Sequence, residues 1–97
     1  MSRFKHITAD EIQDIGKLSQ RPKDEFRNKL DELSSNNPKG YAELIAVMHI
    51  GRGDDSSDNY DMLIKELSLS PAPTFYINEK KRLFQMYIRN GLFILGE

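Results

Sequence analysis

The stretch from Tyr41 to Ile50 carries apolar residues around nearly the whole circumference of a helix. At 100° per residue, one stripe recurs at intervals of three and four residues and comprises Tyr41, Leu44, Ile45 and Met48. The opposite side comprises Ala46, Val47 and Ile50. Glu43 is the one carboxylate in this stretch. A helix that is apolar nearly all round is normally buried on several sides, so the sequence predicts a buried central helix over residues 38–50.

Amphipathic segments on both sides of this helix predict an all-α fold, a single-domain bundle of about five helices spanning residues 1–97. A capping box formed by Thr8 and Glu11 opens the first helix. Pro22 suits the first turn of the second helix. The remaining segments are a fourth helix with its stripe at 60–67, a last helix at about 79–95, an N-terminal arm at 1–7, an acidic loop at 54–59, and a proline-containing connection at 68–73.

The sequence also marks several helix ends. Asn37 followed by Pro38 is a typical cap and first-turn proline, and we expect the central helix to begin there. Gly51 fits the left-handed position that follows a helix, so we expect the central helix to end there. Ser56 or Ser57 is expected to cap the fourth helix.

Residues 74–78 allow two interpretations. They form either a short helical turn leading into the last helix or, over Thr74 to Ile77, a strand. A strand needs a partner, and the chain offers no second strand of comparable quality. The helical turn is therefore the favoured prediction.

The composition limits the classes of function. The chain has 97 residues, no cysteine and a net charge of −1, with 38% hydrophobic and 30% charged residues. A near-neutral chain lacks the global field that draws in nucleic acid or anionic lipid, so such binding needs a local patch. The lack of cysteine removes disulfides, thiolate nucleophiles and cysteine-based zinc sites. With no 18-residue apolar run and no signal-like apolar start, we expect a cytoplasmic protein of bacterial or phage type, without a membrane partner.

Residues 43–54 read E-L-I-A-V-M-H-I-G-R-G-D. This stretch resembles the signature box of a family of small bacterial proteins classed as a domain of unknown function, roughly E-L-[IV]-A-[LV]-x-[WH]-[IL]-G-R-G-D. The C-terminal end is similar to the same family's pattern, so the resemblance covers roughly residues 38–97. The chain departs from it at His49, where Trp is common, and at Arg89 and Asn90, where the family has an acidic pair. The resemblance implies an all-helical cytoplasmic domain with no assigned activity.

The turn after the central helix has two interpretations. Its residues are Gly51, Arg52, Gly53 and Asp54. Backbone N–H groups and the arginine could bind an anion there. The favoured interpretation is a structural turn in which Arg52 pairs with Glu43, Asp54 or Asp55, because the C-terminal end of a helix is negative and repels anions.

Four aspartates lie close together from the end of this turn onward, namely Asp54, Asp55, Asp58 and Asp61. Carboxylate oxygens bind divalent cations, but the spacing of a calcium loop, with its internal glycine and terminal glutamate, is missing. A solvated acidic start of the fourth helix is therefore the favoured interpretation, and a contact with a basic partner is the alternative.

No group of residues predicts catalysis. His6 and His49 are far apart in sequence and have no partner at metal or triad spacing, and we expect His49 to be hydrogen-bonded and half-buried. No serine lies in a G-x-S-x-G motif. We expect no catalytic residues, no cofactor and no metal. A small hydrolase or a metal-dependent enzyme that uses the acidic loop is a third hypothesis, after the two given below.

The last helix offers the candidate partner surface. Its predicted inner face comprises Leu83, Phe84, Tyr87, Ile88, Leu92, Ile94 and Leu95. Met86 and Phe93 lie outside that face, where the pattern expects polar residues. They either contact the N-terminal arm at Phe4 and Ile7 or form an exposed patch that binds a partner.

Four basic residues accompany that patch, namely Lys80, Lys81, Arg82 and Arg89. The first hypothesis is a non-enzymatic interaction or adaptor module that binds a protein, or a second copy of itself, through the last helix. The alternative is nucleic-acid binding or regulation through the four basic residues. A solvated face is the simpler explanation of the charges, so nucleic-acid binding is not the favoured hypothesis.

Overall fold

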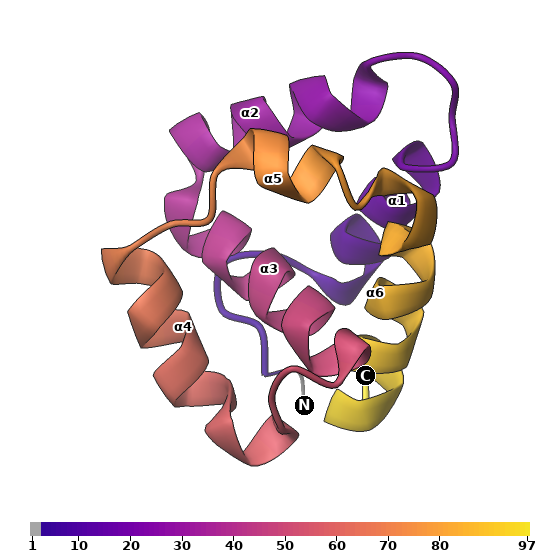
Figure 1. Ribbon diagram of the computed structural model, residues 1–97. Coiled ribbons are helices and arrows are strands. Elements are labelled where there is room, and N and C mark those ends of the chain that lie inside the picture. The colour runs from indigo at the N-terminus through magenta and orange to yellow at the C-terminus, as the bar shows by residue number, and fades with distance from the viewer. Residues whose placement is uncertain (1–2) are drawn as a thin grey trace.

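The computed structural model describes residues 3–97, and over that range the chain is entirely helical apart from turns and connections (Figure 1). The all-α prediction is confirmed. The elements are α1 (Ala9–Leu18), α2 (Glu25–Asn36), α3 (Pro38–Arg52), the short 3₁₀ helix η1 (Ser57–Asn59), α4 (Tyr60–Leu69), α5 (Thr74–Asn78) and α6 (Lys81–Leu95). Residues 74–78 thus form the helical turn and not the strand.

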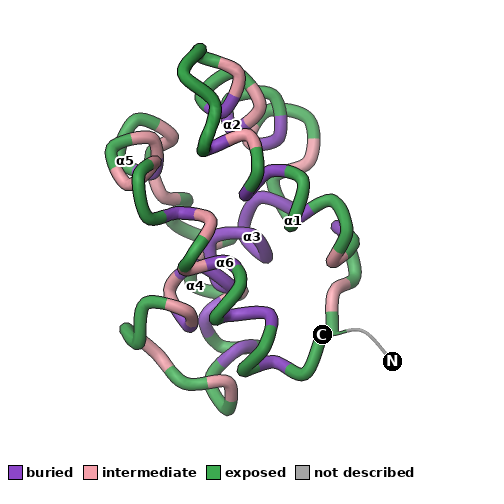
Figure 2. Tube along the Cα trace, turned by 90° about the vertical axis from the view of Figure 1, so that its right-hand side faces the viewer, coloured by how far each residue is buried: buried purple, intermediate pink, exposed green. Residues whose placement is uncertain are grey.

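Helix α3 is the buried centre of the bundle, as its sequence predicts. It packs against α6, α4 and α2, which surround it in Figure 1. Figure 2 shows its trace as almost continuously buried. Leu44, Ile45 and Met48 have no exposed surface, and neither do Ala46 and Val47 on the opposite side. A helix buried on both sides explains why its polar residues are so few.

Two predicted helix starts are confirmed in atomic detail. The Thr8 hydroxyl accepts a hydrogen bond from the Glu11 backbone N–H at 3.1 Å, and the Glu11 carboxylate accepts one from the Thr8 N–H at 3.3 Å. Asn37 caps α3 by accepting from the Gly40 N–H at 3.1 Å, with Pro38 as the first helical residue. These bonds satisfy backbone donors that have no partner inside the helix.

Two other predicted starts are wrong. Helix α2 begins only at Glu25, because the chain leaves α1 through consecutive turn hydrogen bonds at Gln20 and Arg21, and Pro22 lies in the connection that follows. Helix α4 is preceded by η1. Neither Ser56, at the N-cap of η1, nor Asn59, at the N-cap of α4, makes a side-chain capping hydrogen bond. Ser56 does donate its backbone N–H to the Asp55 carboxylate at 2.9 Å.

The predicted end of α3 at Gly51 is also wrong. The helix continues to Arg52, and Gly53, at φ 86°, occupies the left-handed position. Gly51 has a different role, because a Cβ there would overlap the backbone carbonyl oxygen of Tyr87 in α6. Gly91 of α6 meets the Val47 carbonyl of α3 in the same way. The two glycines therefore allow the backbones of α3 and α6 to approach closely.

The N-terminal arm, as far as it is described, lies against the core. Ile7 is buried, and the Phe4 ring packs edge-on against Tyr60 with ring centroids 6.1 Å apart. Residues 1 and 2 of the predicted arm lie outside the described residues. Within residues 3–97, no helix combines the length and hydropathy needed to cross a bilayer.

Candidate interaction surface on the last helix

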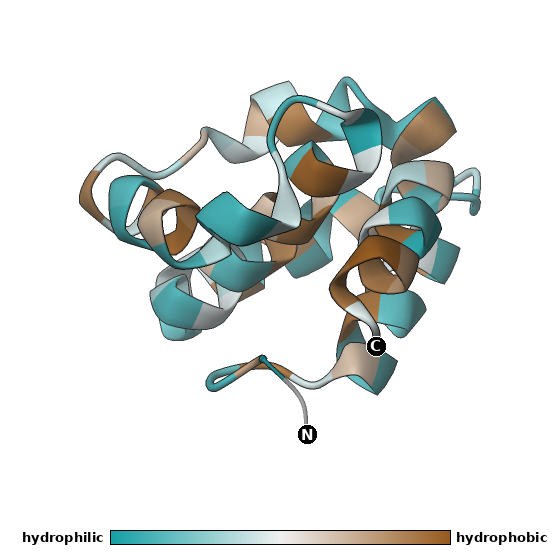
Figure 3. Cartoon of the chain, turned by 90° about the horizontal axis from the view of Figure 1, so that it is seen from below, coloured by the Kyte–Doolittle hydropathy of each residue, from teal (hydrophilic) through white to brown (hydrophobic). Residues whose placement is uncertain are grey.

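Helix α6 packs on α3 and α1 through one face and leaves the other to solvent. The packed face carries Phe84, Ile88, Leu92 and Leu95, all buried, with Gly91 at the crossing with α3. The outer face exposes four large apolar side chains: Leu83, Met86, Phe93 and Ile94. Phe93 is the extreme case, with 85% of its surface exposed. Figure 3 shows hydrophobic bands along the helix that ends at the C-terminus.

This outer face corrects the predicted inner face of α6. Leu83 and Ile94 were expected against the core, yet both are exposed. The reason is geometric, because the neighbours of α6 are chiefly α3 and α1, with Phe26 of α2 against Phe84, and together they bury a narrower stripe than the apolar residues occupy. Met86 and Phe93 are exposed too, so they do not pack beneath the N-terminal arm. The exposed apolar set is therefore larger than the sequence predicts.

Two arginines lie on the same outer stripe. Arg82, Met86, Arg89 and Phe93 follow one another at intervals of four, three and four residues, which places them on one side of the helix. Arg82 and Arg89 are exposed, and no ion pair within residues 3–97 includes either of them. Helix α6 contains no carboxylate. The outer face is thus apolar and positively charged.

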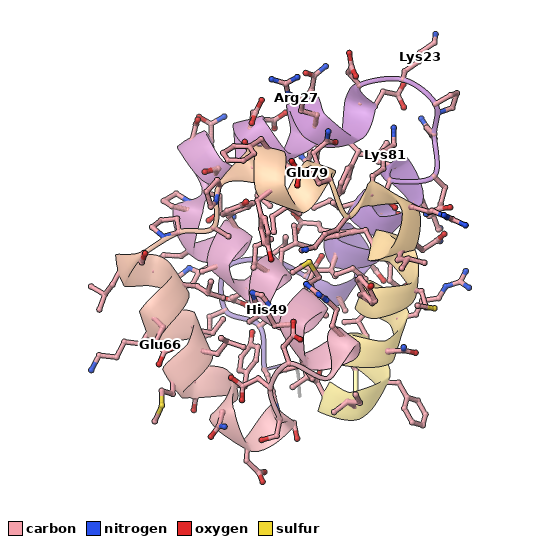
Figure 4. The ribbon with its side chains drawn as sticks, viewed as in Figure 1. Lys23, Arg27, His49, Glu66, Glu79 and Lys81 are labelled. Carbon is pink, nitrogen blue, oxygen red and sulfur yellow. The ribbon has the colours of Figure 1, made fainter. Side chains whose placement is uncertain are left out.

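The other two basic residues of the predicted patch are held elsewhere. The Lys80 ammonium lies 4.0 Å from the centroid of the Tyr76 ring, and its hydrogen bond to the Tyr76 hydroxyl lowers the pKa of that group. The Lys81 ammonium donates to the Lys23 backbone carbonyl at 3.1 Å, and Figure 4 shows Lys81 pointing toward the α1–α2 connection. These two lysines therefore lie beside the outer stripe and do not form part of it.

Two shallow hollows flank the outer stripe along the seam between α1 and α6. One, of about 280 Å³, lies beside Phe93. The other, of about 370 Å³, lies between Arg82, Met86 and Arg89 and the end of α1. Arg89 and Gln85 border both hollows. The surface is therefore uneven and offers recesses for side chains of a partner.

The turn after α3 has the contacts of a structural turn. The Arg52 guanidinium lies 3.5 Å from the Asp54 carboxylate and 5.4 Å from the centroid of the Tyr87 ring. The Asp54 carboxylate also lies 3.2 Å from Nδ1 of His49, which is half-buried as expected and visible on α3 in Figure 4. Arg52 thus pairs with Asp54, one of the three partners considered for it. Through its contacts with Asp54 and with the Tyr87 ring, Arg52 connects the turn to α6.

The aspartates of the acidic loop are not gathered around a common point. Asp55 accepts hydrogen bonds from Asn59 at 2.8 Å and from the Ser56 N–H, and these bonds hold the pKa of its carboxyl below the ordinary range. Over residues 3–97, no group of three or more histidine, aspartate or glutamate side chains is placed to hold a metal ion. The Asp55 carboxylate is therefore occupied by hydrogen bonds within the loop.

Glu43 has a role that the sequence analysis did not predict: it binds the N-terminal arm. Its side chain is buried, with the residue 3% exposed, and it accepts from the backbone N–H groups of Lys5 at 3.1 Å and His6 at 2.9 Å. It also accepts from the Tyr60 hydroxyl at 3.4 Å. A lone carboxylate in an otherwise apolar, buried helix must find donors, and that signal was available in the sequence.

Comparisons with known proteins give no relative for this chain. No protein-family model, no curated protein and no solved structure matches it.

Proposed function

We propose that this protein is a non-enzymatic interaction module that binds through the outer face of α6. One observation carries the proposal: four large apolar side chains and two arginines, which have no carboxylate partner within residues 3–97, share the solvent-facing side of one helix. Exposed apolar patches of this kind are typical of protein–protein interfaces, where arginine and aromatic residues are enriched. The surface therefore calls for a partner that is apolar and acidic.

The partner we propose is the outer face of α4 of a second copy. That face carries Met62 and Leu69, and Leu69 is 81% exposed. Glu66 lies between them on the same side of the helix, and Figure 4 shows it pointing away from the bundle. Asp58 precedes this face in η1. An acidic, apolar helix face complements the basic, apolar face of α6 in both charge and hydropathy.

Pairing α6 of one copy with α4 of the next joins two different surfaces. Such a head-to-tail contact leaves one free face at each end, so copies add until a ring closes or a chain extends. Pairing α6 with α6 would bring the exposed arginines of two copies to one interface, where like charges repel. The head-to-tail arrangement is therefore the one that the charges favour.

Sedimentation velocity of three proteins tests the proposal. We expect the mass of the wild type to rise with concentration, whereas Met86→Lys/Phe93→Lys and Met62→Lys/Leu69→Lys each sediment as monomers. An equal mixture of the two variants should form dimers and nothing larger, because each variant keeps one intact face. A wild type that stays monomeric at about 1 mM, where even weak complexes form, would overturn self-association. Dimers of Met62→Lys/Leu69→Lys alone would overturn the role of α4.

Nucleic-acid binding through the last helix is the second candidate, supported by the exposure of Arg82 and Arg89. A salt titration of binding to mixed DNA and RNA decides between the two. If α6 binds nucleic acid, Arg82→Glu/Arg89→Glu should weaken binding and reduce the slope of log K against log salt by about two. No binding at low salt would remove this candidate. For either function, a bacterial cytoplasmic location remains part of the proposal.

A further inference from the structure

A third hollow lies away from α6, between the N-terminal arm, the first turns of α3 and the inner side of α4. Its volume is about 350 Å³, within the range of small-molecule sites. Its walls carry four Lys or Arg side chains, namely Arg3, Lys5, Lys39 and Lys65, together with His6. Two carboxylates, Glu43 and Asp61, border the same space. The hollow is thus positively charged although the chain has a net charge of −1.

Over the part of the chain that the structure describes, the four cations have no carboxylate partner. Each ion pair within residues 3–97 lies elsewhere, and none includes Arg3, Lys5, Lys39 or Lys65. Arg3 donates to the Ser57 backbone carbonyl at 3.1 Å, which positions its guanidinium without neutralising it. Like charges gathered in one concave site raise the local potential and attract an anion.

The site is preformed because the arm is fixed along its length. The Glu43 carboxylate accepts from the N–H groups of Lys5 and His6. The Asn37 side chain donates to the His6 carbonyl at 2.8 Å while it caps α3. With Arg3 bound at Ser57, the arm is attached at both ends of the hollow. A ligand would therefore meet an arm whose backbone is already in place, which lowers the entropy cost of binding.

The hollow also has an apolar wall. Ile64 is half-buried there, and Tyr60, whose hydroxyl donates to Glu43, lines the hollow beside it. An anion without an apolar part, such as inorganic phosphate, would leave this wall in contact with water. A ligand with a compact apolar body and a doubly charged head would use both parts of the site.

From these observations we propose that the hollow binds a small organic phosphate, with the phosphate among Lys5, Lys39 and Lys65 and the apolar body against Ile64. The inference goes beyond the interaction surface of α6 and does not depend on it. Lysine ammonium groups bind phosphate as point charges, and lysines from three separate segments surround a dianion from several directions.

Amide chemical shifts in NMR titrations test this proposal with three probes: phenyl phosphate, inorganic phosphate and phenol. We expect saturable shifts at residues 39–43 and 60–68 with phenyl phosphate, at an affinity about tenfold or more above that of inorganic phosphate. Phenol should produce no saturable shifts there. Lys39→Gln/Lys65→Gln should weaken phenyl phosphate binding about tenfold or more, because two charge-assisted contacts are lost.

The matched control is Lys17→Gln/Lys23→Gln, which removes the same net charge from exposed positions elsewhere. It should leave the affinity for phenyl phosphate unchanged. The proposal is overturned if phenyl phosphate gives no saturable shift at about 10 mM, where weak sites are occupied. It is overturned equally if inorganic phosphate binds as tightly as phenyl phosphate, or if the control weakens binding as much as the Lys39/Lys65 variant.

Discussion

Glu43 shows how one buried charge can organise a segment distant in sequence. Two backbone N–H groups of the arm and the Tyr60 hydroxyl surround its carboxylate, and none of the donors is a charged side chain. A buried carboxylate is tolerated when hydrogen bonds replace the water it loses. Its removal would leave all three donors without their acceptor.

We expect Glu43→Ala to lower the free energy of unfolding by about 3 kcal/mol, since three partly or fully buried donors lose their acceptor. Urea denaturation followed by circular dichroism measures the loss. Glu66→Ala is the matched control, because Glu66 is exposed on α4 and should change stability by less than about 0.5 kcal/mol. Equal effects of the two substitutions would contradict the role assigned to Glu43.

Glycines at two positions should respond in opposite directions to the same substitution. Gly51→Ala places a methyl group on the Tyr87 carbonyl oxygen, so we expect a loss of about 2–3 kcal/mol from the forced separation of α3 and α6. Gly16→Ala places one at 3.6–3.7 Å from Gln85 and Ile88, an ordinary contact inside a helix. It should raise stability by about 0.5–1 kcal/mol. Thermal unfolding of both variants measures these shifts, and a neutral Gly51→Ala would count against the close crossing.

At the scale of the element, Asn37 joins the start of α3 to the arm. Its Oδ1 caps the helix at Gly40, and its Nδ2 donates to the His6 carbonyl. We expect Asn37→Ala to cost about 1–2 kcal/mol, the sum of a lost cap and a lost hydrogen bond. Asn36→Ala, at the exposed neighbouring position, should cost less than about 0.5 kcal/mol. Chemical denaturation of the two variants gives the comparison, and a smaller effect at Asn37 would refute the double role.

The helices themselves were largely predictable, because their signals are local. The capping box at Thr8, the cap and proline at Asn37 and Pro38, and the apolar periodicity of α3 depend on residues within a few positions of one another. The end of α3 was not predictable by the same reasoning. Gly51 carries the local signature of a terminator, and only the approach of α6 gives it another role.

The same distinction applies to the candidate surface. The sequence singled out Met86 and Phe93 because they break the pattern of α6, and both are exposed. Leu83 and Ile94 follow the pattern and are exposed nevertheless. Whether an apolar residue on a helix is covered depends on how many neighbours the fold supplies, and that number is a property of the tertiary arrangement. The sequence can therefore identify some residues of the exposed surface, but it cannot define where that surface ends.

At the scale of the whole molecule, two buried tyrosines link stability to pH. Burial, reinforced by nearby carboxylates, raises the pKa of Tyr60 beside Glu43 and of Tyr41 near Asp31 above the ordinary value. In the unfolded chain both hydroxyls lose their protons near about pH 10. Above that pH the unfolded state binds fewer protons than the native state, so the free energy of unfolding must fall as pH rises.

We therefore expect stability that holds up to about pH 9 and then declines through pH 10 and above, as the unfolded tyrosines ionise. Urea denaturation at a series of pH values measures the decline, and Tyr60→Phe should make it shallower. Tyr76→Phe is the control. Tyr76 is exposed and its hydrogen bond from Lys80 lowers its pKa, so Tyr76 does not contribute to the decline and its substitution should not make the decline shallower. A stability that stays level or rises between pH 9 and 11 would contradict the prediction.

The hydrogen bonds between Glu43 and the N-terminal arm determine which sequence changes the arm can accept. The Glu43 carboxylate takes hold of peptide N–H groups, which every residue except proline possesses. The side chains at positions 5 and 6 can therefore be replaced while the N-terminal arm keeps its hydrogen bonds to Glu43. Substitutions at positions 5 and 6 can therefore change the ligand preference of the hollow without changing the fold. Proline is the exception, because it lacks the N–H group that Glu43 binds.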